Sequence, residues 1–114
     1  MCDRIFVLQD ENGYWHSSLL DMKNYPDPET SGSSLNVYAF AFGVNSGLLD
    51  KDKYLPIIEK GWKALEDAVF PDGKLGWVQP VGGWPVKIEK EMTEAYGVGT
   101  FLLAGSEVIK LFVK

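Results

Sequence analysis

The chain has 114 residues, of which 46% are hydrophobic and 24% charged, so it has the composition of a folded protein and the length of one domain. Its net charge of −5 disfavours binding to nucleic acid or to an anionic membrane surface. The single cysteine, Cys2, excludes an internal disulfide and a cysteine-based metal site. We expect no membrane span and no signal peptide, since Asp3 and Arg4 interrupt the first apolar run, and therefore a cytoplasmic protein.

The first 32 residues predict little regular structure. Residues 1–9 fit the last turns of a helix and a short strand equally well, because the apolar run is so short. A turn signal follows at residues 10–13, and Pro26 and Pro28 exclude a regular helix further on. We therefore expect residues 10–32 to form one long connection that is rich in polar and aromatic side chains.

A first long helix is predicted over about residues 33–45, and it is apolar on nearly every side. Ser31, Ser33 or Ser34 can cap its start, and Gly47 suits the left-handed position after its end. A helix that is apolar all round is buried all round. Other helices must therefore pack around it.

A second helix is predicted over about residues 54–70, with Pro56 in its first turn. Apolar residues at helical spacing form one stripe, and charged residues occupy the opposite face. The stripe consists of Leu55, Ile58, Trp62, Leu65 and Val69. Because Trp62 lies in the middle of this stripe, we expect it in the core.

The last third of the chain predicts an irregular β-hairpin followed by a helix. Residues 75–88 contain two short apolar runs around a Gly-Gly pair, with prolines at positions that do not pair. The third long helix begins at residues 94–97 and ends near residue 112, with a broad apolar face. We expect it to be largely buried.

The order of these elements predicts an all-α fold in a single domain over residues 1–114. Helices joined by short loops are antiparallel, so both long loops fall at the N-terminal ends of the two apolar helices, on one rim. Alternating inner and outer helices are typical of an α/α toroid, here an incomplete one. A flat helical bundle remains the alternative.

The predicted rim favours a carbohydrate ligand. It gathers Trp and Tyr rings with amide, hydroxyl and carboxylate groups, and helix N-termini favour an anionic group such as a sugar acid. Plainer roles compete, since Glu29 can be a helix cap, His16 is a lone histidine and Trp77 can pack beneath the hairpin. No Ser-His-Asp triad can be assembled, and we expect no metal and no cofactor.

Several segments resemble the C-terminal part of the unsaturated glycosyl hydrolases of families 88 and 105. They are residues 13–21 (GYWHSSLLD), 29–33 (ETSGS), 71–82 (PDGKLGWVQPVG) and 96–108 (YGVGTFLLAGSEV). The resemblance implies a six-hairpin α/α toroid that acts on oligosaccharides with an unsaturated uronic acid end, as lyases leave them. It also implies that an Asp protonates the sugar double bond, water adds, and the product opens to release the next sugar.

The resemblance places no catalytic residue in this chain, because the Asp of the family lies in a preceding segment. It implies a set of substrate-binding residues on the rim: Trp15, His16, Glu29, Thr30, Ser31, Trp77 and Tyr96. Two interpretations follow, a part of a hydrolase that is inactive alone, and a small oligomeric helical module that binds carbohydrate or another partner. Because the inner helices are too apolar to face water, we expect a homo-oligomer or a complement that supplies the N-terminal half.

Overall fold

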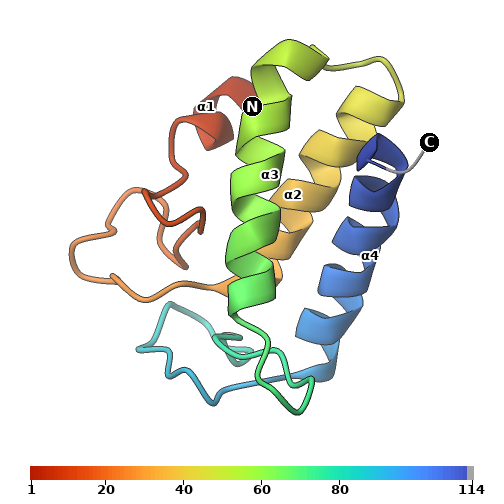
Figure 1. Cartoon of the computed structure of the whole chain (residues 1–114). Coiled ribbons are helices and arrows are strands. Elements are labelled where there is room, and N and C mark those ends of the chain that lie inside the picture. Colours follow the sequence, from red (N-terminus) through yellow and green to blue (C-terminus); the bar gives the residue numbers. More distant parts are fainter. Residues whose placement is uncertain (113–114) are drawn as a thin grey trace.

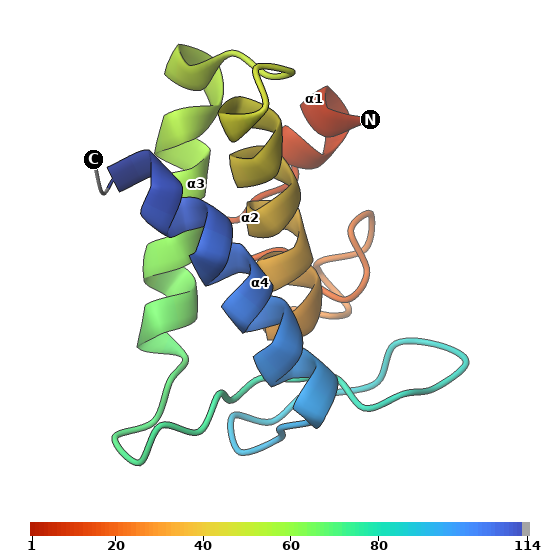
Figure 2. The ribbon, with the colours of Figure 1, turned by 90° about the vertical axis from the view of Figure 1, so that its right-hand side faces the viewer.

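The computed structural model describes residues 1–112 and is helical, with no β-strand among them (Figure 1). Its helices are α1 (Cys2–Phe6), α2 (Thr30–Asn45), α3 (Lys51–Asp67) and α4 (Ala95–Phe112). The three long helices pack together, and α2 contacts both α3 and α4 (Figure 2). The predicted all-α class is confirmed, and the short N-terminal apolar run is a helix rather than a strand.

Helix α2 begins three residues earlier than predicted because Glu29, and not a serine, is its cap. The Glu29 carboxylate accepts hydrogen bonds from the backbone N–H groups of Ser31 and Gly32. The predicted caps Ser33 and Ser34 lie inside the helix and are buried. The end agrees with the prediction, since Gly47 has a φ of 75°, in the left-handed region.

The burial of α2 is less complete than its composition suggests. Val37, Phe40 and Ala41 are fully buried, whereas Leu35 and Phe42 remain about half exposed. The prediction that α2 is buried all round is therefore wrong for the described residues taken alone.

Helix α3 begins at Lys51 with Asp50 as its cap, so Pro56 lies in the second turn and not in the first. Its buried face also differs from the predicted stripe, and consists of Tyr54, Ile57, Ile58, Gly61, Ala64 and Leu65. Trp62 lies at the edge of this face, only partly buried, with its ring stacked on Phe101 at 4.9 Å between centroids. The prediction that Trp62 is a core residue is corrected accordingly.

Helix α4 is long and apolar enough to cross a membrane, by length and composition only, which corrects the expectation that no segment is. Its apolar side chains divide between two faces. Ala104 and Val108 are buried, whereas the exposed ones are Val98, Leu102, Leu103, Ile109 and Phe112. A core helix of a large α-helical protein meets the same criterion, and α4 packs along α2.

The predicted hairpin near residues 75–88 is absent. Val69 and Leu75 form one isolated antiparallel bridge, and the backbone then bonds to partners outside the expected hairpin. These bonds are Gly76 N–H to Ala68 O, Trp77 N–H to Lys90 O and Val78 N–H to Met92 O. The segment is therefore an ordered loop that backbone hydrogen bonds hold against residues 90–92.

Both long loops meet at the N-terminal ends of α2 and α4, while the short loop between α2 and α3 lies at the other end (Figure 1). Thr30, the first residue of α2, joins the two loops. Its N–H donates to Trp77 O at 2.9 Å, and its Oγ1 donates to Gly76 O at 2.7 Å. The predicted single rim is confirmed, and we call this end of the molecule the rim below.

Candidate functional site

Glu29 is the centre of the hydrogen-bond network at the rim, and it is only 6% exposed. Its Oε1 accepts from Ser31 N–H (3.1 Å), Ser31 Oγ (2.6 Å) and Gln79 N–H (3.0 Å), and its Oε2 accepts from Gly32 N–H (2.6 Å). The carboxylate therefore occupies the N-terminal end of α2. The expectation that this helix end receives an anionic ligand group does not fit, because the N–H groups there already have an anion.

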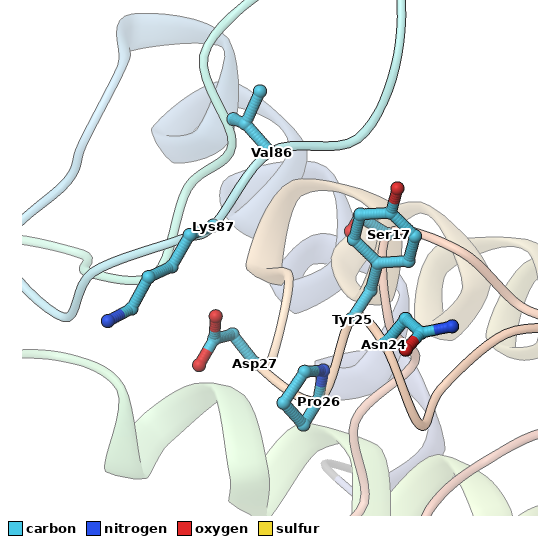
Figure 3. A pocket seen from close by; sticks show the side chains of 7 residues that line it. All are labelled: Ser17, Asn24, Tyr25, Pro26, Asp27, Val86 and Lys87. Carbon is cyan, nitrogen blue, oxygen red and sulfur yellow. The ribbon is translucent and has the colours of Figure 1, made fainter.

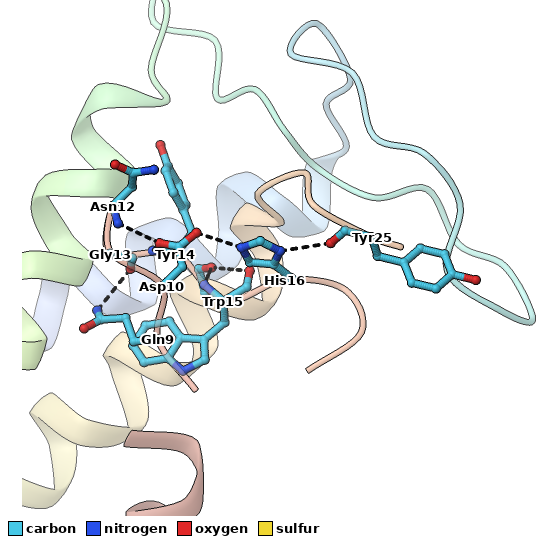
Figure 4. Close-up of polar contacts among 9 residues, drawn as sticks. Gln9, Asp10, Asn12, Gly13, Tyr14, Trp15, His16 and Tyr25 are labelled. Atoms are coloured by element: carbon cyan, nitrogen blue, oxygen red, sulfur yellow. Dashed lines mark hydrogen bonds and ion pairs between the residues drawn. The ribbon is translucent and has the colours of Figure 1, made fainter. Parts of the chain in front are cut away.

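His16 ties down the loop that precedes α2 (Figure 4). Its Nδ1 donates to the carbonyl oxygen of Tyr25 at 2.9 Å, and its Nε2 lies 2.7 Å from Asp10 Oδ2. Asp10 also accepts from the backbone N–H groups of Asn12 and Tyr14, each at 2.9 Å. Both ring nitrogens are thus engaged, so His16 holds the loop in place and has no nitrogen left to act as a base.

The ring of Trp15 belongs to the core, although the residue also lines one hollow at the rim. It is 1% exposed, its ring contacts Phe40, and its Nε1 donates to Ile5 O at 2.8 Å. Neighbouring residues of an extended segment point to opposite sides, so His16 faces the rim while Trp15 faces inward. The expectation that the Trp15 ring faces a ligand is therefore wrong.

Thr30 and Trp77 are buried or partly buried at the rim and pack beneath its surface. Thr30 is fully buried at the start of α2, where it donates hydrogen bonds to the carbonyl oxygens of Gly76 and Trp77. Trp77 is partly buried against the small cluster that contains Leu75 and Val78. Its φ of 58° lies in the left-handed region, which is strained for a side chain of this size.

Tyr96 and Ser31 line the same hollow of the rim. Tyr96 is 40% exposed, and its hydroxyl donates to the carbonyl oxygen of Gln79. Burial raises the pKa of Tyr96, and the charges of Glu94 and Glu29 raise it further. The hydroxyl therefore keeps its proton at neutral pH and remains a donor.

Three hollows open at the rim. One of about 280 Å³ is lined by Ser31, Gln79, Pro80, Val81, Gly82 and Tyr96. Another of about 280 Å³ is lined by Trp15, His16, Ser17, Leu19, Glu29, Gly32, Leu35, Asn36 and Gln79. The largest, of about 420 Å³, lies between two loops and is lined by Ser17, Asn24, Tyr25, Pro26, Asp27, Val86 and Lys87 (Figure 3).

The sequence did not indicate the largest hollow, and it did not distinguish Gln79 from the other polar residues of the predicted rim. Asp27 accepts a hydrogen bond from Ile88 N–H at 3.3 Å, which brings two loops together that are about half the chain apart. The two prolines at 26 and 28 were the available signal, since they stiffen one wall. Residues 1–112 hold no group of three or more His, Cys, Asp or Glu side chains that could bind a metal ion.

Helices α2 and α4, with the two long loops at their N-terminal ends, have the arrangement of part of an α/α toroid. The sequence profile of Glycosyl Hydrolase Family 88 matches residues 1–112, and the chain belongs to this family. An unsaturated 3S-rhamnoglycuronyl hydrolase of Formosa agariphila is 47% identical over 111 residues, which are 97% of this chain and 29% of that protein. A hydrolase of the same name from an Alteromonas species is 40% identical, over 92% of this chain and 25% of that protein.

Solved structures agree with this assignment. A family 88 glycosyl hydrolase from Bacteroides vulgatus superposes with a TM-score of 0.91 at 41% identity, over 96% of this chain and 33% of that one. A possible family 105 member from Salmonella enterica has a TM-score of 0.84 at 21% identity, which shows the fold alone. The chain spans about a quarter to a third of the length of these relatives.

Proposed function

We propose that these 114 residues form part of the substrate-binding wall of a hydrolase that removes an unsaturated uronic acid from lyase-generated oligosaccharides. Family 88 membership and the names of the two relatives support this substrate class. The hollows of the rim, lined by hydroxyl, amide and aromatic groups, support a carbohydrate ligand. In this proposal the rim holds and orients the sugar.

We also propose that the acid which protonates the sugar double bond lies outside these residues. The observation that supports this proposal is that the carboxylates of the rim already accept hydrogen bonds from other groups of the chain. Glu29 accepts four hydrogen bonds, Asp10 is engaged by His16 and two backbone N–H groups, and Asp27 accepts from Ile88 N–H. A general acid must present a proton to the substrate, whereas these oxygens act as acceptors.

An absorbance assay tests this division of roles. The isolated chain, mixed with unsaturated uronyl disaccharides, should cause no detectable loss of the absorbance of the double bond, because removing a general acid costs about 10²–10⁴-fold in rate. Any weak binding should be millimolar. A further carboxylate of the loop before α2, Asp21, accepts from Asn24 Nδ2. Turnover that follows the purified protein and disappears in Glu29→Gln or Asp21→Asn would overturn the proposal, because the chain would then contain its own acid.

The exposed apolar face of α4 favours a second candidate, a small oligomeric helical module that binds carbohydrate without catalysis. The face includes Leu102, which is 64% exposed, and a hollow of about 320 Å³ lies beside it. That hollow is lined by Trp62, Gly105, Val108, Ile109 and Phe112. Apolar patches of this kind mark interaction sites, and for the isolated chain the available partner is a second copy.

We expect the isolated chain to be a dimer or a higher oligomer in light scattering at micromolar concentration. Leu102→Glu should shift it toward a monomer, because a carboxylate cannot be buried in an apolar contact without a partner. Leu20→Glu is the matched control, since Leu20 is 78% exposed but lies in a loop. A monomeric wild-type chain with a cooperative melt would contradict this prediction.

A further inference from the structure

We propose that Gln79 is a substrate-binding residue, whose side-chain carbonyl oxygen accepts a hydrogen bond from a hydroxyl of the sugar. The inference rests on the proposed carbohydrate ligand and names the group that would hold it. It follows from four separate features of this residue: an unpaired side chain, a fixed backbone, a strained neighbour and a position between two hollows.

The first feature is an unpaired atom. Gln79 Oε1 is buried and has no hydrogen-bond partner among the residues that the structure describes. Buried polar atoms are nearly always paired, and an unpaired one costs stability. The other such side-chain atom in the described part of the chain is Ser34 Oγ, which lies within α2 and lines none of the hollows at the rim.

The second feature is a backbone held on both sides. The N–H of Gln79 donates to Glu29 Oε1 at 3.0 Å, and its carbonyl oxygen accepts from the Tyr96 hydroxyl. One partner stands at the start of α2 and the other in the first turn of α4. The main chain of Gln79 is therefore fixed to both inner helices, while its side-chain oxygen has no partner among the described residues.

The third feature is strain close by in the chain. Trp77, two residues earlier, keeps its left-handed φ because its carbonyl oxygen accepts from Thr30 N–H and its own N–H donates to Lys90 O. Pro80, the next residue, restricts Gln79 to extended conformations. Strained backbone that several contacts hold in place is typical of binding sites.

The fourth feature is position. Gln79 lines both hollows of about 280 Å³, one with Ser31 and Tyr96 and the other with His16 and Asn36. A ligand that enters either hollow would therefore lie against Gln79. Hydroxyl and amide groups dominate the nearby polar atoms, and a sugar hydroxyl matches them as donor and acceptor.

The other glutamine of the chain provides a matched control. Gln9 is also partly buried, but its Nε2 donates to the carbonyl oxygens of Gly13 (3.0 Å) and Ile57 (3.2 Å). Its amide joins a loop to α3. The same substitution at the two positions therefore separates a side chain that stabilises the fold from one that is kept for a ligand.

The test uses Gln79→Met and Gln9→Met in the full 114-residue chain, labelled with ¹⁵N and titrated with an unsaturated uronyl disaccharide. Wild type should show shifts of rim amides, and Gln79→Met should bind about tenfold more weakly, the factor that one hydrogen bond contributes. Its thermal midpoint should stay unchanged or rise, since the unpaired oxygen is removed. Gln9→Met should lower the midpoint and leave the affinity of the folded protein unchanged.

The possible failures are distinguishable. Wild-type shifts that Gln79→Met reproduces at the same sugar concentrations would overturn the role of Gln79 and leave the proposed function standing. A lower thermal midpoint in Gln79→Met would also overturn it, because the amide would then be structural. No rim shift in wild type up to the solubility limit of the sugar would overturn both this inference and the sugar-binding role of the chain.

Discussion

Trp15→Ala should lower the free energy of unfolding by about 3–5 kcal/mol, as expected when a large buried side chain is removed and leaves a cavity. Trp15 is fully enclosed, lies 6.0 Å from the Phe40 ring between centroids, and loses its Nε1 hydrogen bond to Ile5 O when truncated. Urea denaturation followed by far-ultraviolet circular dichroism measures this loss.

Trp62→Ala is the matched control for Trp15→Ala. Trp62 is only partly buried and its ring stacks on Phe101 at the edge of the helices, so the loss should be less than half as large. A loss for Trp62→Ala equal to or greater than that for Trp15→Ala would show that the two tryptophans have been assigned to the wrong environments.

Glu29→Ala should destabilise the chain by about 2–4 kcal/mol, because it removes a helix cap and hydrogen bonds to a buried charged group. The change also leaves the N–H groups of Gly32 and Gln79 without their acceptor. Glu29→Gln keeps the shape and one acceptor oxygen, so its loss should be intermediate. Chemical denaturation that shows a loss below about 0.5 kcal/mol for Glu29→Ala, the lower limit for a helix cap, would contradict this role.

The three long helices and the shared rim could be predicted from the sequence. Their apolar spacing, the turn signals between them and the left-handed Gly47 are local features, and local features determined these boundaries to within a few residues. The rim followed from loop lengths alone, since short loops join antiparallel helices.

The environments of Trp15 and Trp62 could not be predicted because they depend on contacts between distant segments. The short extended segment around Trp15 gives no sign of which side faces α2, and that is decided by Trp15 N–H donating to Ser33 Oγ, 18 residues away. The buried face of α3 is rotated from the predicted stripe for a similar reason. Small residues, Gly61 and Ala64, allow close packing there.

The loop at residues 75–88 shows the same limit. Apolar runs around a Gly-Gly pair predict a hairpin, but the backbone of residues 76–78 bonds to Ala68, Lys90 and Met92 instead. In the sequence, Gln79 is one of several polar residues expected at the rim, with nothing to single it out. Its unpaired amide becomes visible only when Glu29 and Tyr96 are seen to hold its backbone.

The most direct test of the account is a chimera in which these 114 residues replace the matching segment of the Formosa agariphila hydrolase, which is 47% identical over 111 residues. If these residues form part of the substrate-binding wall, the purified chimera should turn over the unsaturated substrate of the parent within about tenfold of the parent's rate. A misplaced substrate would instead cost about 100-fold in rate. A chimera that melts cooperatively like the parent, yet is slower by 100-fold or more, would contradict the claim that these residues form that wall.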